Sequence, residues 1–327
     1  MPDSTDKCEA VSPSCPVEAT TYGYAPNLGG NGLYAVIFAI CALAQFYFVC
    51  RFWRTWKVFS ILTLVGCIGE CCGYVGRILL HNNPWDGASM TIQFLLLMVS
   101  PSFLAAALYT TLRTLVQYFG PEHTRLPARF WTWPFVTADL LGFFLQCGGG
   151  ILASMGDTNP SLAKVGNGIM IFGVTFQAVT MGVAGILAID FGLRIRRRQG
   201  AHVFEELPKN LKIFLLTMAA AFLLILTRCI YRIPELAGGV GGPMMRKEAE
   251  FMIFDGIMIL FAVIIQTAVH PGIFASATQQ SATHVYESKA QASSLEDGLE
   301  DGYEMGGEGQ HLHSRQDSHR RRLSRDY

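Results

Sequence analysis

Charged side chains are scarce in this chain. Asp, Glu, Lys and Arg together make up 15% of its 327 residues, whereas about a quarter of an ordinary soluble domain is charged. Hydrophobic residues make up 51%, and they form long apolar blocks between positions 33 and 272. This distribution argues against two soluble globular domains and predicts a single membrane domain with polar ends.

Several functional signatures are also absent from the sequence. It contains no G-x-x-x-x-G-K-[ST] loop for ATP, and no Ser-His or Cys-His arrangement of the kind used in nucleophilic catalysis. All eight histidines fall in loops, in the tail or at the end of an apolar block, which disfavours the iron-binding histidine clusters of membrane hydroxylases. We therefore expect a protein that is not an enzyme, needs no cofactor and does not bind nucleic acid.

The cysteines divide into two groups. Cys67, Cys71 and Cys72 share an apolar block, where cysteine usually acts as a small hydrophobic residue, so we expect no metal site there. Cys8 and Cys15 lie in a polar N-terminal segment without the basic start and apolar core of a signal peptide. They form either a small disulfide loop, if this segment faces an oxidising compartment, or two free thiols.

Seven apolar blocks are long enough to cross a bilayer, which takes about 20 helical residues. Such blocks are too long for ordinary strands, and in lipid their backbone groups must bond within the segment, which selects helices. The sequence thus predicts an all-α, polytopic membrane protein. The predicted spans are Leu33–Cys50, Val58–Leu80, Met90–Leu112, Phe130–Ala153, Asn167–Leu193, Leu211–Ile233 and Phe251–His270.

Lys and Arg predict how the spans are oriented. The loops after the first, third and fifth spans hold twelve basic residues, whereas the opposite side holds four: Lys7, Lys164, Arg246 and Lys247. Basic loops stay in the cytosol, so we expect the N-terminus outside and the C-terminus in the cytosol.

The two ends of the chain differ in composition from the spans. We predict an extracellular or lumenal tail over residues 1–32, a seven-helix domain over 33–272 and a cytosolic tail over 273–327. The cytosolic tail is rich in Ser, Gln, Gly and acidic residues, which predicts disorder. Its end resembles a site for a basophilic cytosolic kinase at Ser324; the alternative is a basic end that contacts anionic lipid.

Charged and amide side chains inside the spans carry the functional signal, because a charge at the centre of a membrane helix costs about 2.5–3.5 kcal/mol on insertion scales. Glu70 and Arg77 share a face of the second span but lie about 10 Å apart along its axis, so we expect them to reach other helices. The candidate site residues are Glu70, Arg77, Asp139, Gln146, Gln177, Arg228, Arg232, Glu235 and Asp255.

The predicted orientation gives these residues a depth. Most of them, together with Gln93 and Glu250, fall in the outer half of the membrane, Glu70 and Gln146 lie nearer the middle, and only Asp139 falls in the inner half. We hypothesise one polar cavity open toward the outer leaflet, with Glu70 and Asp139 as deeper stations. The alternative is a structural ion-pair network that fixes the register of the helices.

Glycine and proline within the spans predict local packing. Gly66, Gly69, Gly73 and Gly76, and the run from Gly148 to Gly150, allow helices to approach closely. Pro101 removes one helical hydrogen bond from the third span, so we expect a kink there.

These motifs, in this order, resemble the fungal RTA-like proteins, the lipid-translocating exporter family, over about Tyr24 to Gly272. Two positions depart from the family pattern, since Gly142 stands where Ser is more usual and Ser100 where a small apolar residue is expected. The resemblance is carried by Tyr24-x-Pro26, Gly66-x-x-Gly69-Glu70-x-x-Gly73-Tyr74-x-x-Arg77, Ala106-Ala107-Leu108-Tyr109, Asp139-x-x-Gly142-x-x-x-Gln146-x-x-Gly149-Gly150, Gly173-x-x-x-Gln177, Arg228-x-x-Tyr231-Arg232-x-x-Glu235, Glu250 to Asp255, and His270-Pro271.

The resemblance implies seven helices, a fungal source and a role in moving lipids or resisting toxic amphiphiles. Branches of the family are associated with export of sphingoid long-chain bases, with resistance to sterol-like amines and with porphyrin movement. We therefore expect a transporter or floppase for an amphiphilic lipid, in the plasma membrane or else in a vacuolar or other internal membrane. The alternative is a seven-helix sensor of lipid or membrane stress, because a seven-span count says little about function by itself.

Overall fold

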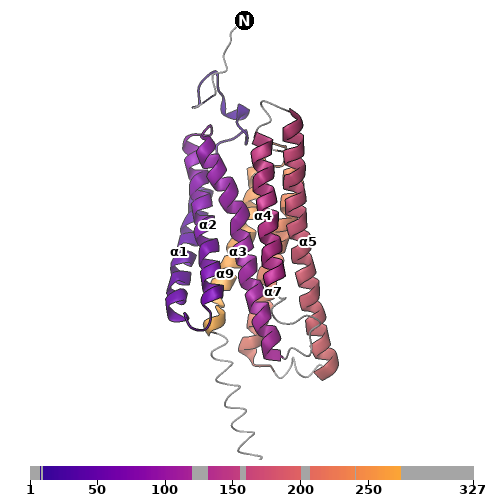
Figure 1. The fold of residues 1–327 in the computed structure, drawn as a ribbon. Coiled ribbons are helices and arrows are strands. Elements are labelled where there is room, and N and C mark those ends of the chain that lie inside the picture. Colours follow the sequence, from indigo (N-terminus) through magenta and orange to yellow (C-terminus); the bar gives the residue numbers. More distant parts are fainter. Residues whose placement is uncertain are drawn as a thin grey trace, which may run out of the picture. The chain divides into compact units, whose positions relative to one another are not determined.

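The computed structural model describes residues 8, 10–119, 132–154, 160–199, 207–239 and 241–273. In these residues the chain forms helices and no β-strand (Figure 1). The predicted disordered tail and Ser324 lie outside the described residues, as does the start of the predicted fourth span. The helices are η1 (Val17–Ala19), α1 (Leu28–Arg51), α2 (Lys57–Asn82), α3 (Gly87–Phe119), α4 (Trp133–Ser154), α5 (Pro160–Gln199), α7 (Lys209–Ala237), α8 (Glu248–Phe251), the π-helical η5 (Met252–Ile257) and α9 (Met258–Ala268).

Seven helical segments are long and apolar enough to cross a membrane, which confirms the all-α, seven-span prediction. The last of them joins α8, η5 and α9 into one segment, Glu248–Ile273. The sidedness of the termini stays a prediction.

The first helix begins earlier than hydropathy predicts. It starts at Leu28 rather than Leu33, because the side chain of Asn27 caps it by accepting a hydrogen bond from the Gly30 N–H at 2.8 Å. Capping chemistry, which hydropathy does not record, sets this boundary.

The distribution of side chains is that of a protein surrounded by lipid. Large apolar side chains dominate the outside, such as Leu43 at 72% and Leu216 at 73% exposure. The interior instead holds many polar and charged groups, including Glu70 at 1% and Arg77 at 0% exposure. Polar groups that turn away from hydrocarbon and toward one another are what a membrane interior requires.

Helix packing brings distant parts of the chain together. The second helix, α2, packs against both α1 and α3, α4 packs along α5, and α7 packs against α5 and α9 (Figure 1). Residues 10–27 lie at one end of this bundle, here called the N-terminal end. At the opposite end α1 and α9 finish.

Replacing two neighbouring glycines of α4 with alanine should have opposite effects on stability. A Cβ atom added to Gly149 would lie 2.7 Å from the Gly166 carbonyl oxygen and 2.8 Å from the Met170 backbone nitrogen of α5, whereas one on Gly148 would meet nothing within 4 Å. We expect Gly149→Ala to destabilise the protein by about 1–3 kcal/mol through overpacking. Gly148→Ala should be neutral or stabilising by up to about 1 kcal/mol, because Ala favours helix. Thermal unfolding of both variants in detergent checks this; equal stability would contradict close α4–α5 packing.

Candidate functional site

Asp255 lies at the centre of a buried ion cluster. Its Oδ1 lies 2.8 Å from the Nε of Arg228 and 2.9 Å from Nη2 of Arg232. Arg232 also places Nη1 3.0 Å from an oxygen of Glu235. All four residues are at most 3% exposed. The three α7 residues, at spacings of four and three, thus turn one helix face toward η5, as their sequence spacing predicts.

A π-helical turn positions Asp255. In η5 the backbone adopts the wider π geometry, which occurs mostly as single turns and frequently at functional sites. The hydroxyl of Tyr34 on α1 donates to the Met252 carbonyl at 2.9 Å and so satisfies one backbone group of this turn. Gly256 lets the turn approach α1 and α2 closely, since a Cβ there would lie 2.6 Å from Tyr34 Cε2 and 3.1 Å from the hydroxyl of Tyr74.

A proline in α3 gives Arg228 its second partner. Pro101 has no N–H, so the carbonyl of Leu97, four residues earlier, lacks its helical hydrogen bond. The Nη2 group of Arg228 donates to this carbonyl. The Leu97 carbonyl, which Pro101 leaves without a helical hydrogen bond as predicted, thus binds the buried guanidinium group of Arg228 on α7.

Glu70 borders this cluster from α2. Its carboxylate is in electrostatic range of Arg228, Arg232 and Asp255, yet its Oε1 has no hydrogen-bond partner among the described residues. The Oδ2 atom of Asp255 is also unpartnered there. We call Glu70, Arg228, Arg232, Glu235 and Asp255 the charged cluster. It holds two guanidinium groups and three carboxyl groups, and its unpartnered oxygens are acceptors.

Arg77 belongs to a neighbouring but separate arrangement. Its Nε donates to Asn31 Oδ1 at 3.0 Å, its Nη1 to Gln93 Oε1 at 3.5 Å and its Nη2 to the Tyr24 hydroxyl at 3.3 Å. Glu248 supplies a carboxylate oxygen 3.6 Å from Nη2. As the sequence predicts, Arg77 reaches other helices rather than Glu70. Every nitrogen of the Arg77 guanidinium group has a protein partner, which favours a structural role in holding the helices together rather than a role in binding a ligand.

Aromatic rings enclose the Arg77 guanidinium. Its carbon lies 5.3 Å from the centre of the Tyr22 ring and 4.1 Å from that of Phe251, and Phe251 also lies 5.4 Å from the Arg232 guanidinium. Burial raises the pKa of Tyr24 to about 12 in spite of the nearby Arg77, so the phenol stays neutral. Tyr22 and Tyr24 thereby tie the N-terminal segment to the bundle.

The remaining predicted site residues form two further groups. Gln146 of α4 donates to Gln177 of α5 at 3.0 Å, and Gln177 donates to Ser102 of α3 at 2.7 Å. Asp139 of α4 neighbours Tyr109 and Cys229, and its carboxyl group lies within hydrogen-bonding range of the Tyr109 hydroxyl. The predicted single cavity stays a prediction, because the contacts divide the site residues into distinct groups.

Sequence reasoning missed the acidic partner of Arg77. It placed Glu250 with the charged side chains in the outer half of the membrane, whereas Glu250 pairs at 2.7 Å with the exposed Lys247 and Glu248 faces Arg77 instead. The two glutamates lie two residues apart, so the start of the helical segment decides which one faces the interior. The signal that identifies Glu248 is its second bond, since its Oε1 accepts the N–H of the capping residue Asn27 at 2.6 Å.

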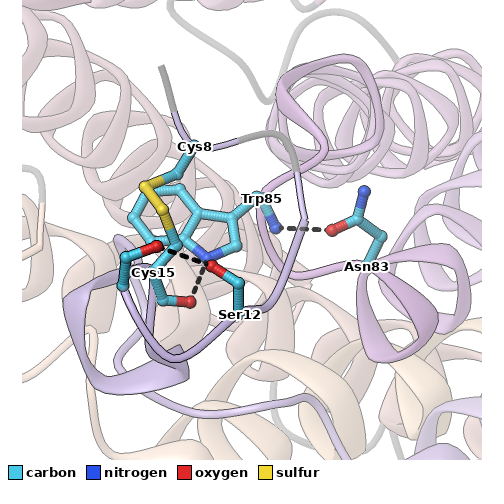
Figure 2. The surroundings of a disulfide bond; sticks show 6 residues. Cys8, Ser12, Cys15, Asn83 and Trp85 are labelled. Atoms are coloured by element: carbon cyan, nitrogen blue, oxygen red, sulfur yellow. Dashed lines mark hydrogen bonds between the residues drawn. A yellow bond between two sulfur atoms is a disulfide. The ribbon is translucent and has the colours of Figure 1, made fainter. Parts of the chain in front are cut away.

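The open alternative for the N-terminal cysteines is settled in favour of a disulfide between Cys8 and Cys15. Figure 2 shows the Trp85 indole beside this bond, and its Nε1–H donates to the Cys15 carbonyl at 3.3 Å. Trp85 follows the end of α2, and its own N–H donates to Asn83 Oδ1 at 3.2 Å. The disulfide loop is therefore joined to the α2–α3 connection.

Removing this disulfide should loosen the N-terminal segment locally. For Cys8→Ser with Cys15→Ser we expect the opening free energy of the segment to fall by about 2–3 kcal/mol, from the entropy of a loop this short. The Thr20 and Gly23 amides, which donate to Val17 and Thr20 carbonyls, should then exchange hydrogen faster. Hydrogen exchange with mass spectrometry measures this, with α9 as the internal control; unchanged exchange at both amides would contradict it.

Comparison with known proteins places this geometry in a family. The family described as RTA1 like protein matches residues 63–278, which include every residue of the charged cluster. The chain belongs to this RTA1-like family. No solved structure matches the chain significantly.

Named relatives of this RTA1-like chain come from Saccharomyces cerevisiae. Protoporphyrin uptake protein 1 is 33% identical over 61% of this chain, and that match spans 64% of the relative's own length. Sphingoid long-chain base transporter RSB1 is 28% identical over 76% of this chain and 73% of its own. Protein RTM1 is 29% identical over 61% and 63%. Two of these relatives are named for transport or uptake of lipid-like compounds, and none is named as an enzyme.

Proposed function

We propose that this protein moves amphiphiles with an amine-bearing head group, such as sphingoid long-chain bases, between the leaflets of a membrane. Glu70 and Asp255 accept hydrogen bonds from the ammonium group while the hydrocarbon tail stays in lipid. Arg228, Arg232 and Glu235 hold Asp255 in place.

The observation that carries this proposal is the mismatch of donors and acceptors in the charged cluster. Three carboxyl groups face two guanidinium groups, and Glu70 Oε1 and Asp255 Oδ2 have no hydrogen bond among the described residues. Arg228 Nε and Glu235 Oε2 also lack a hydrogen bond, but each has an ion-pair partner, at 2.8 Å and 3.0 Å. All three nitrogens of the Arg232 guanidinium already have protein partners. An ammonium head supplies the missing charge and donors, whereas an anionic head would find few free donors.

The named relatives support the substrate class. One is named for sphingoid long-chain bases and another for protoporphyrin uptake, and both substrates are amphiphiles. The surplus of acceptors in this chain favours the cationic base over a porphyrin, which carries carboxylates. Asp139, Gln146 and Gln177 stand in our proposal as polar groups along the route of the head group.

Orientation and compartment complete the proposal. The excess of Lys and Arg on one side supports an N-terminus outside, and the Cys8–Cys15 disulfide agrees, because disulfides persist on the oxidising side of a membrane. We place the protein in the plasma membrane, with the N-terminal end facing out. Transport is driven by a proton gradient, with Glu70 as a candidate proton acceptor, or it runs down the substrate gradient.

Purified protein in liposomes tests this function against that of a pure sensor. A fluorescent long-chain base should change leaflets at least about tenfold faster than in empty liposomes. The N-acetylated base, which has no ammonium group, and a porphyrin should move much more slowly. Rates for all three compounds equal to those of empty liposomes would contradict a transport function, and faster movement of the porphyrin would contradict the amine preference.

A further inference from the structure

A second group of buried polar side chains lies between α1, α2 and α9, away from the charged cluster. We call it the amide group, and it consists of Gln45, Thr63, Gln266 and Thr267. Gln45 Nε2 donates to the Thr267 hydroxyl at 3.1 Å, which connects α1 to α9. Both glutamines and Thr63 are 0% exposed. None of these residues carries charge, so a search for intramembrane charges does not find them.

Two contacts fix how α2 and α9 lie side by side. Near the end of the bundle where α9 finishes, Ser60 Oγ and His270 Nε2 are 2.8 Å apart. Toward the N-terminal end, Tyr74 lies next to Gly256. The two contacts lie near opposite ends of α2, so α2 and the last membrane segment run antiparallel.

This antiparallel arrangement assigns a level to the amide group. Thr63 lies about one helical turn along α2 from Ser60, and Gln266 lies about one turn along α9 from its end near His270. Glu70 lies seven residues farther along α2, about 10 Å toward the N-terminal end. The fully buried Cys67 lies between Thr63 and Glu70 along α2, and the fully buried Val263 lies between Asp255 and Gln266 along the last segment. The amide group and the charged cluster are thus two polar levels separated by an apolar layer.

The side-chain amide of Gln266 is the observation that indicates a ligand at this level. Neither its Nε2 donor nor its Oε1 acceptor has a hydrogen-bond partner among the described residues, and Gln45 Oε1 lacks one as well. A fully buried amide that leaves both its functions unused is strongly disfavoured, and such groups usually bind a small polar molecule. The other interior glutamines behave differently, since Gln146 and Gln177 bond to each other.

His270 closes this level toward the end of the bundle. Its Nδ1 accepts the Gly272 N–H at 3.0 Å, so the ring proton sits on Nε2 and points to Ser60 Oγ. Ser60 in turn donates to the Trp56 carbonyl at 3.1 Å. The rings of Phe48, Phe52 and Phe59 surround the imidazole. These bonds use the polar atoms of His270 and Ser60, so they are not available to Gln266.

We propose that Gln266, with the free oxygen of Gln45, binds a small group that both donates and accepts a hydrogen bond. The ligand is a hydroxyl group, supplied either by the head of the transported amphiphile or by bound water. The first source rests on the proposed function: a long-chain base carries hydroxyl groups next to its amine. Gln266 then holds the head group at one level, and Glu70 receives it beyond the apolar layer.

Gln266→Leu tests this inference, because leucine keeps the approximate volume and removes both polar functions. Gln177→Leu is the matched control for the melting temperature alone: it leaves Gln146 and Ser102 without their partner and should lower the melting temperature. The assay compares movement of sphingosine with that of octadecylamine, which has the same chain length and an amine but no hydroxyl. Hydroxyl-radical footprinting, in which radicals form from bound water, monitors Cys41 beside Thr267.

Each source of the hydroxyl gives its own result. If the head group supplies it, Gln266→Leu slows sphingosine about tenfold and leaves octadecylamine unchanged. If water supplies it, the substitution slows both amines equally and abolishes labelling of Cys41. Wild-type rates for both amines, with unchanged labelling and a raised melting temperature, would overturn the inference. If wild-type protein moves neither amine, the proposed function fails, and loss or persistence of the Cys41 label alone decides this inference.

Discussion

Replacing Asp255 with Asn is expected to lower the free energy of unfolding by about 3–5 kcal/mol, as is typical when one partner of a buried ion pair is removed. One oxygen of Asp255 forms ion pairs with both Arg228 and Arg232, and it accepts a hydrogen bond from Arg232. Without the carboxylate, two buried guanidinium groups face each other with only Glu235 and Glu70 to balance them. All of these residues are at most 3% exposed, so bulk solvent cannot hydrate the excess positive charge, and the variant loses stability.

An exposed ion pair provides the control for this variant. Asp190 and Arg194 of α5 form an i,i+4 pair at 2.8 Å, and both side chains are more than a quarter exposed. Asp190→Asn makes the same chemical change and should cost no more than about 1 kcal/mol. Thermal unfolding in detergent measures both. Equal effects of the two substitutions would show that the charged cluster does not stabilise the fold.

The helices follow from elementary physics of the sequence. Seven apolar blocks of bilayer length leave the backbone no alternative to helix, so the existence and order of the spans are predictable, although α3 and α5 extend up to seven residues beyond their predicted ends. The facing of Arg228, Arg232 and Glu235 also follows, because their spacing places them on one helix face. Boundaries fixed by caps are less predictable, as Asn27 shows for α1.

Other features depend on tertiary contacts that no local pattern records. The π-helical turn at Asp255 exists beside Tyr34 and Gly256, which come from different parts of the chain. Glu248 and Glu250 are two residues apart and so point to nearly opposite sides of their helix. Which of them faces Arg77 depends on how that helix is rotated about its axis. Gln266 was overlooked because an uncharged amide barely interrupts an apolar block, although its burial without a partner distinguishes it in the structure.

Glu70→Gln should separate transport from folding. The substitution keeps the size of the side chain and removes its charge, which leaves two guanidinium groups opposite two carboxylates in the charged cluster. Because no hydrogen bond holds Glu70 Oε1, we expect a stability change within about 1 kcal/mol. The head group, however, loses a charged acceptor; a loss of about 1.4 kcal/mol or more corresponds to at least a tenfold lower rate.

The most direct test of a head-group site at the charged cluster is the leaflet exchange of a fluorescent long-chain base in proteoliposomes. Wild type, Glu70→Gln and the control Glu250→Gln, a partly exposed glutamate outside the charged cluster, should be reconstituted at equal protein density. The proposed mechanism predicts wild-type rates for Glu250→Gln and at least a tenfold lower rate for Glu70→Gln, with both variants folded. Equal rates for wild type and Glu70→Gln would contradict it.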